Sequence, residues 1–320
     1  MTDLQNTCIV GSGYMGGGIA QSLALSGCSV VIADVDESTA RQSLDRIIRE
    51  TTEYEDLGLF SHGSTEIIRS KITAAASIEA AVVGAHYIAE VVSERIEVKE
   101  SVLNRISNAA SSTAVIATNT SGLRIAVLEG FVDGPQRFLG VHWMNPAPFV
   151  PGVEIIPGTQ TDDHIVASVR RLMSRAGKVA ITVKDTPGFV ANRLQYALHK
   201  EASRMIEEGV VSPFELDQVV SNSFGFRLAF FGPFTIADMA GLDVYVDTYR
   251  SMEAAFGERF ATPKSLLDAV RQGNYGVKHG QGLTGLDESM QQRIAEYRNR
   301  AYSSLSALKT EIGPVPRKVT

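Results

Sequence analysis

The stretch that decides the fold is Thr7-Cys-Ile-Val-Gly11-Ser-Gly13-Tyr-Met-Gly16, close to the start of the chain. Its apolar run predicts a short strand, its glycines predict a tight turn, and the helical spacing of apolar residues over 19–25 predicts a helix. A second apolar run over 29–33 predicts the next strand and ends on Asp34. Strand, helix and strand together form a βαβ unit, which begins a parallel sheet.

The glycine turn also predicts a ligand. Gly-x-Gly-x-x-Gly is a weak signal alone, but here it joins a strand to a helix, and an acid ends the next strand 23 residues after Gly11. Gly11 would permit the turn, Gly13 would let the backbone approach a diphosphate, and Gly16 would let the helix pack closely on the strand. Asp34 would bind ribose hydroxyls and repel a 2′-phosphate, which favours NAD over NADP. The alternatives are FAD and a glycine turn in an unrelated α/β fold.

The rest of the N-terminal part continues the alternation of strands and helices. Residues 38–71 predict one or two helices, broken around Gly58 and Gly63. This alternation predicts an α/β fold with a Rossmann-type doubly wound sheet, mostly parallel and covered by helices. Further strands are expected over 86–92, 114–118, 138–142, 153–156 and 179–183.

The pattern changes near residue 185, and beyond it the periodicity is helical. With 320 residues, two domains are expected. We therefore predict an N-terminal dinucleotide-binding domain over 1–185 and an all-α C-terminal domain over 186–320. Its helices are expected over 189–208, 213–222, 233–256, 264–271 and 286–310.

Composition and charge narrow the range of partners. The chain has 30 basic and 36 acidic residues, a formal net charge of −6, and no run of five cations, so neither nucleic acid nor an anionic membrane is an expected partner. No apolar run is long enough to span a membrane. The polar start of the chain does not resemble a secretory signal, and Cys8 and Cys28 fall in or beside predicted buried strands. A cytoplasmic location is expected.

The segment 137–157 carries the most chemical information. It predicts a strand ending on His142, a proline-rich loop, and a strand returning with Glu154. In such a hairpin the carboxylate could face the imidazole and orient it as a base, although a packed core histidine and a surface acid fit the pattern as well. Ser121 follows a predicted strand and Asn192 begins a predicted helix, so each could bind a ligand or cap a helix. No cluster has the spacing of a zinc site, and no metal is expected.

Several motifs in a matching order give the sequence a resemblance to the short-chain L-3-hydroxyacyl-CoA dehydrogenase family, nearly throughout the first 285 residues. They are Gly11-Ser-Gly-Tyr-Met-Gly-Gly-Gly-Ile-Ala20, Asp34, Glu90-Val-Val-Ser-Glu94-Arg-Ile-Glu-Val-Lys99, Ala117-Thr-Asn-Thr-Ser121, His142 to Pro146, Asp185 to Arg193, and Gly232-Pro-Phe with Asp238 and Asp243.

The resemblance implies a reaction and a set of roles. His142 would be the general base and Glu154 the carboxylate that orients it, while Ser121 and Asn192 would hold the substrate oxygens. The implied reaction transfers hydride from a secondary 3-hydroxyl to NAD and gives a 3-keto product, as in fatty acid metabolism, in a homodimer formed through the helical domain. The residues implied at the cofactor are Gly11, Gly13, Tyr14, Met15, Gly16 and Asp34, with Glu94, Lys99, Asn145 and Lys278 on the nicotinamide side.

The substrate is left open by departures from the family pattern. Family members that bind coenzyme A carry a lysine-rich hairpin after the second strand, where this chain has Arg49-Glu50-Thr-Thr-Glu53-Tyr-Glu55-Asp56. Gly122 replaces a second serine, and about 35 residues follow the usual end of the family. These features resemble the L-gulonate (lambda-crystallin), carnitine and pyridine-carboxylate dehydrogenase branches. A coenzyme A thioester and a small free acid or zwitterion both remain candidates, and a non-catalytic crystallin-like protein is a remote third.

Overall fold

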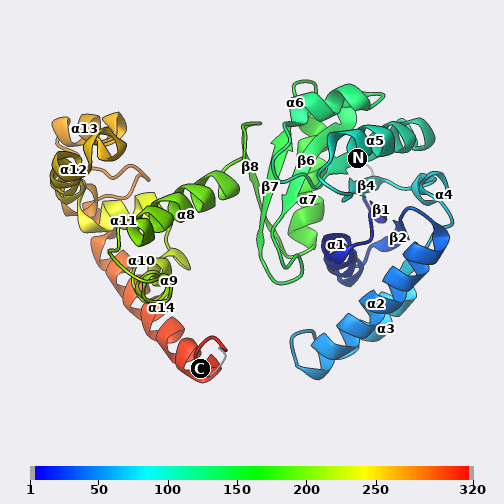
Figure 1. Cartoon of the computed structure of the whole chain (residues 1–320), viewed down its shortest axis with the longest axis horizontal. Helices are drawn as coiled ribbons and strands as arrows, with labels where there is room; N and C mark the ends of the chain where they lie inside the picture. Colours follow the sequence, from blue (N-terminus) through cyan, green and yellow to red (C-terminus); the bar gives the residue numbers. More distant parts are fainter. Residues whose placement is uncertain (1–3, 317–320) are drawn as a thin grey trace. The chain divides into compact units, whose positions relative to one another are not determined.

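The computed structural model describes residues 4–316, so the first three and last four residues of the two expected domains lie outside the described part (Figure 1). The chain divides into two compact units, Met1–Lys200 and Glu201–Thr320. This division falls inside helix α8 (Ala191–Glu207), beyond the change of pattern at residue 185. The difference arises because the start of α8 is hydrogen bonded to the N-terminal unit: the amide nitrogen Nδ2 of Asn192 lies 2.8 Å from the Ser121 carbonyl oxygen.

The N-terminal unit is built on an eight-stranded sheet with the order β3-β2-β1-β4-β5-β6-β7-β8. Neighbouring strands are parallel except β6 and β7, which pair antiparallel. This sheet confirms the predicted α/β class. The edge strand β3 was not predicted, because three residues are too few to give a periodic signal. The strands are β1 (Asn6–Val10), β2 (Ser29–Ala33), β3 (Ile72–Ala74), β4 (Tyr87–Glu90), β5 (Val115–Thr118), β6 (Phe138–Trp143), β7 (Gly152–Pro157) and β8 (Val179–Thr182).

Helices cover both faces of this sheet (Figure 1). Along β1, Ile9 packs in one hydrophobic cluster while Cys8 and Val10 pack in another, so the two clusters lie on opposite faces. Side chains of α1, α2, α3 and α7 complete the first cluster, and those of α4, α5 and α6 complete the second. The helical segments are α1 (Tyr14–Leu25), α2 (Glu37–Asp56), α3 (Ser64–Lys71), α4 (Ile78–Val82), α5 (Ile96–Ala109), α6 (Ile125–Leu128), η1 (Glu129–Phe131), η2 (Pro135–Arg137) and α7 (Asp163–Arg175).

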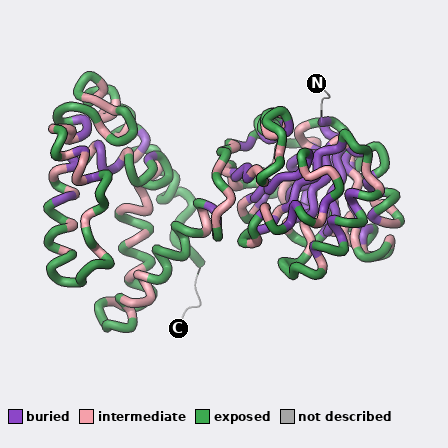
Figure 2. The backbone as a smooth tube through the Cα atoms, turned by 90° about the horizontal axis from the view of Figure 1, so that it is seen from above, coloured by how far each residue is buried: buried purple, intermediate pink, exposed green. Residues whose placement is uncertain are grey.

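The C-terminal unit is helical, as predicted. The helix expected over 233–256 is interrupted at Gly241, whose φ of 106° ends one helix and begins the next. Buried residues are concentrated in the N-terminal unit, which carries the N label in Figure 2, and are sparse in the helical unit. Its segments are α9 (Pro213–Asn222), α10 (Phe224–Leu228), α11 (Pro233–Ala240), α12 (Leu242–Phe256), η3 (Gly257–Phe260), α13 (Lys264–Arg271), η4 (Gly276–Lys278), η5 (Glu288–Met290) and α14 (Gln291–Ile312).

No helix within residues 4–316 combines the length and the apolar character that a membrane span requires.

Candidate active site

The glycine turn has the geometry that a dinucleotide requires. Gly11 has a φ of 98°, in the left-handed region that favours glycine, and a side chain at Gly16 would collide with the carbonyl oxygen of Gly11. Gly13 is the N-cap residue of α1, and a Cβ there would meet nothing within 4 Å. No side chain of the described residues caps α1, so its first N–H groups are available to an anion such as a diphosphate. Tyr14 and Met15 form the first turn of this helix.

Asp34 lies at the carboxyl end of β2, beside this turn. Its Oδ2 accepts hydrogen bonds from the Ser12 backbone N–H at 2.7 Å and from the Ser12 hydroxyl at 2.6 Å. Arg46 donates from Nη2 to the carbonyl oxygens of Ser12 at 2.7 Å and Gly13 at 3.2 Å, which braces the turn from the side of α2. A pocket of about 370 Å³ lies next to these residues. Its lining includes Gly11, Gly13, Asp34, several valines, Ser93 and Arg105.

The hairpin of β6 and β7 brings His142 and Glu154 together. The two residues are directly paired in the antiparallel register, so their side chains lie on the same face of the sheet. His142 Nδ1 lies 2.9 Å from Glu154 Oε2, and both side chains are buried. Burial acts to raise the pKa of Glu154, but the hydrogen bond from His142 and the backbone N–H groups of Ala191 and Val190 outweigh it, so the pKa is lowered. The carboxylate is therefore held in its charged form beside the imidazole.

The turn before α8 fixes this pair from outside the sheet. Glu154 Oε1 accepts the backbone N–H groups of Val190 and Ala191, each at 3.0 Å. Phe189 has a φ of 48°, which a bulky residue adopts only where its surroundings hold it. Its ring is buried and lies 5.6 Å from the His142 ring, centroid to centroid. Phe189 thus shields one side of the imidazole from water.

Ser121 and Asn192 also lie together. Ser121 follows β5, and its carbonyl oxygen accepts the Asn192 side-chain amide at 2.8 Å. The Ser121 backbone N–H donates to Glu94 at 2.7 Å. Lys99, on α5, is wholly buried behind Glu94 and is 3.4 Å from Oε2 of that residue.

The two other residues implied on the nicotinamide side lie in different units. Asn145 follows β6 in a loop whose carbonyl groups at Ala147, Pro148 and Val150 accept hydrogen bonds from Lys178 Nζ, at 2.6, 3.1 and 2.9 Å respectively. Burial lowers the pKa of Lys178. Lys278 belongs to the helical unit, where its Nζ lies 3.7 Å from Asp243 Oδ1.

Sequence reasoning did not select Ser12, Arg46 or Lys178, although each holds a segment with predicted site residues in place. Ser12 stands inside the quoted glycine motif, so its position was visible but its bond to Asp34 was not. Arg46 and Lys178 contact segments about 30 residues away in sequence, and no local pattern marks such contacts.

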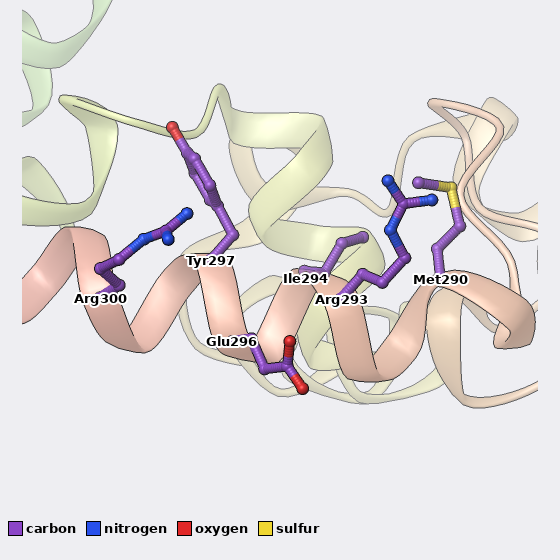
Figure 3. A pocket seen from close by; sticks show the side chains of 6 residues that line it. All are labelled: Met290, Arg293, Ile294, Glu296, Tyr297 and Arg300. Carbon is purple, nitrogen blue, oxygen red and sulfur yellow. The ribbon is translucent and has the colours of Figure 1, made fainter.

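A hollow of about 580 Å³ lies along α14 of the helical unit (Figure 3). None of its lining residues is a predicted site residue. They are Met290, Arg293, Ile294, Glu296, Tyr297 and Arg300. Within residues 4–316, no group of three or more His, Cys, Asp or Glu side chains is arranged to hold a metal ion.

Comparison with known proteins identifies the family. The sequence model of the family described as 3-hydroxyacyl-CoA dehydrogenase, NAD-binding domain, matches residues 6–186. The sequence model of the C-terminal domain of 3-hydroxyacyl-CoA dehydrogenase matches residues 188–285. The 5-formyl-3-hydroxy-2-methylpyridine 4-carboxylate 5-dehydrogenase of Mesorhizobium japonicum is 34% identical over 281 residues, which cover 88% of this chain and 90% of that protein. The human lambda-crystallin homolog is 34% identical over 245 residues, 75% of this chain and 77% of that protein.

Among solved structures, the 3-hydroxyacyl-CoA dehydrogenase of Archaeoglobus fulgidus superposes with a TM-score of 0.78 at 32% identity, covering 97% of this chain and 99% of that one. The NAD-binding domain match confirms NAD as the cofactor, and the glycine turn described above fits it. The chain therefore belongs to the 3-hydroxyacyl-CoA dehydrogenase family and is an NAD-dependent dehydrogenase that acts on a hydroxyl group.

Proposed function

We propose that His142 is the general base in the oxidation of a secondary alcohol that lies β to a carbonyl group. The observation that carries this proposal is the 2.9 Å contact between His142 Nδ1 and Glu154 Oε2, in a pair whose carboxylate is itself fixed by two backbone N–H groups. Because Nδ1 faces Glu154, Nε2 is the ring atom left to take a proton from a hydroxyl group. The charge of Glu154 then stabilises the imidazolium that forms.

Ser121 and Asn192 are the residues that we propose for holding the substrate. Their contact at 2.8 Å, from the Asn192 side-chain amide to the Ser121 carbonyl oxygen, joins the loop after β5 to the start of α8, so the Ser121 backbone and the Asn192 side chain are held in place before a substrate binds. NAD, when bound at the glycine turn, supplies the acceptor for the hydride. The residues of the chain supply proton removal and orientation, and no covalent bond to the protein is needed.

For the substrate, we propose a 3-hydroxyacyl-CoA, the class for which the family is named. A small free acid is the second candidate. It is favoured by the charge of α2, where Glu50, Glu53, Glu55 and Asp56 crowd one end of the helix, because acids repel a polyanion such as coenzyme A. The relative from Mesorhizobium japonicum is named for a pyridine carboxylate, and it is consistent with this second candidate.

The test is NADH formation by the purified protein, followed by absorbance. The panel is 3-hydroxybutyryl-CoA, free 3-hydroxybutyrate, L-carnitine, L-gulonate and, for comparison with the relative from Mesorhizobium japonicum, a pyridine carboxylate bearing a formyl group. Turnover of the thioester alone supports the first candidate, and turnover of a free acid alone supports the second. Inactivity over the whole panel, together with no NAD binding by calorimetry, would refute the dehydrogenase proposal.

We also propose that the helical unit, together with α8, the helix in which the division between the units falls, pairs two chains into a homodimer. Apolar residues along α8 support the pairing: Leu194, Leu198 and Met205 share one side of the helix and are 58%, 45% and 38% exposed. A cytoplasmic location is proposed because Cys8 and Cys28 are both free thiols in the buried core. A role in fatty acid metabolism would follow from the first substrate candidate.

A further inference from the structure

Lys99 lies in a place where a ligand cannot reach it. Its side chain on α5 is 0% exposed, and its Nζ lies 2.8 and 3.0 Å from the two carboxylate oxygens of Glu90. Its remaining neighbour of opposite charge is Glu94, whose Oε2 is 3.4 Å away. The ammonium group is thus surrounded by protein carboxylates. A direct contact with the nicotinamide, which the family resemblance implies, would require this buried arrangement to open.

Glu90 is equally enclosed and has its own set of partners. It ends β4, is 0% exposed, and accepts the Thr118 hydroxyl at 2.6 Å and the Val92 backbone N–H at 2.8 Å as well as Lys99. A buried carboxylate is stable only when it is paired and hydrogen bonded, and Glu90 satisfies both conditions. The Glu90 and Lys99 pair therefore links β4, β5 and α5 through buried hydrogen bonds.

Glu94 connects the buried Glu90 and Lys99 pair to the loop after β5. Its side chain is 43% exposed, and its Oε1 accepts hydrogen bonds from the Thr120 hydroxyl, from the Ser121 backbone N–H at 2.7 Å and from the Gly122 backbone N–H at 3.1 Å. One carboxylate oxygen thus binds three donors of the loop after β5. The other oxygen faces the Lys99 ammonium, so the position of Glu94 depends on Lys99.

We infer that Glu90 and Lys99 are positioning residues, which act through Glu94 on the loop that carries Ser121. This inference rests on the proposed function in one respect, namely that Ser121 holds the substrate. The positive charge of Lys99 lets the Glu90 and Glu94 carboxylates lie close together. Glu94, held in this way, accepts the backbone N–H groups of Ser121 and Gly122 and so fixes the backbone of the loop. Loss of Lys99 should then affect substrate handling more than cofactor affinity.

The test compares Lys99→Met, Glu94→Gln and the double variant with the wild type. Three quantities are measured: amide hydrogen exchange of the segment 119–123, kcat/KM for the substrate, and the NAD dissociation constant by calorimetry. Each single variant should speed exchange in the segment and lower kcat/KM about 10-fold, the size expected for losing one charged hydrogen-bond partner. In Lys99→Met, NAD affinity should change much less than kcat/KM. The double variant should be no worse than the poorer single variant, because both changes break the same link.

A double variant covers the case in which Lys99→Met does not fold, and an exposed acid on α5 serves as the control. Lys99→Met leaves Glu90 buried without its counter-charge, so Glu90→Gln/Lys99→Met removes both charges and tests the same link if the single variant does not fold. Glu97→Gln is the control, because Glu97 is an exposed acid on the same helix, and its Oε2 lies 4.0 Å from Arg95 Nε. It should leave exchange and kcat/KM unchanged.

Two results would overturn the inference. In the first, the fold loss of kcat/KM in the double variant equals the product of the losses in the two single variants, so that Lys99 and Glu94 act independently. In the second, Lys99→Met loses as much NAD affinity as kcat/KM, which is what a direct cofactor contact would give. A wild type that binds NAD but turns over no substrate would contradict the proposed function alone, since the exchange rates report on the loop without turnover.

Discussion

The two units of the chain differ in how many of their side chains are buried. The N-terminal unit buries charged groups and pairs them, as in Glu90 with Lys99 and His142 with Glu154. In the helical unit and the helix that leads into it, α8, α9 and α10 contain no buried residue. Large apolar residues such as Val219 and Phe234 are 61% and 59% exposed there.

This difference suits the two parts of the chain to different roles: the proposed catalytic residues lie in the N-terminal unit, and the exposed apolar faces of the helices are suited to association. A base held by a buried carboxylate needs a fixed geometry, and the hydrogen-bond partners described above for His142 and Glu154 lie within the N-terminal unit. Exposed apolar faces, in contrast, are unfavourable in water until another surface covers them. Changes in the N-terminal site should therefore alter rates, and changes on the helical faces should alter association.

The strongest test of this separation is His142→Ala. Loss of the general base should lower kcat about 10²- to 10⁴-fold, the usual contribution of general base catalysis. The NAD dissociation constant should stay close to that of the wild type, because the glycine turn is not touched. Steady-state kinetics and calorimetry measure the two quantities. His164→Ala, at an exposed histidine of the same unit, is the control and should keep full activity; a loss of only a few-fold in His142→Ala would remove His142 from its role.

On the other side of the comparison, Leu198→Asp places a charge on the apolar side of α8, the helix in which the division between the two units falls. Burying an unpaired carboxylate in an interface is costly, so the variant should sediment as a monomer at concentrations where the wild type is a dimer. Sedimentation velocity over a range of concentrations measures this. Gln195→Asp puts the same charge on another side of the helix and should leave association intact. A wild type that stays monomeric throughout would contradict the pairing itself.

The same division describes what the sequence could predict. The glycine turn and Asp34 follow from local patterns, since a turn and a strand end are each encoded over a few residues. The hairpin pattern allowed the pairing of His142 with Glu154 but fitted a packed core histidine as well, and the family resemblance decided between them. Glu90 and Lys99 were visible as a motif, but their burial depends on how β4, β5 and α5 pack. The helical unit was predicted as helices, yet the break at Gly241 was not, because the apolar periodicity continues across it.

A smaller effect is expected at the ribose side of the cofactor site. Asp34→Ala removes the acceptor for ribose hydroxyls, so NAD should bind about 10-fold more weakly, as for the loss of a hydrogen bond to a charged group. NADP should lose less, because the repulsion of its 2′-phosphate is removed as well. Calorimetric titration with both nucleotides measures the ratio. An unchanged preference for NAD would show that Asp34 does not set it.

The smallest effect should come from Glu55, which joins α2 to α3 within the N-terminal unit. Its carboxylate accepts the backbone N–H groups of Thr65 at 2.8 Å and Gly63 at 2.6 Å, and these bonds lower its pKa from 4.5 to about 2. Because the pKa is lower in the folded state, the stabilisation is complete above about pH 4.5 and is lost as the pH falls toward 2. Glu55→Gln should therefore lower the Tm by a few degrees near neutral pH, and the difference from the wild type should vanish near pH 2.

Thermal unfolding followed by circular dichroism between pH 2 and 7 measures this difference, with Glu53→Gln, at an exposed acid of the same helix, as the control. A Tm difference that stayed constant with pH would mean that Glu55 acts through packing and not through its charge. A difference that shrinks with acid would show a charged carboxylate holding two segments of the N-terminal unit together. The N-terminal unit would then use the same contact at two places, because Glu55, like Glu154 in the candidate active site, is a carboxylate fixed by backbone N–H groups of a turn before a helix.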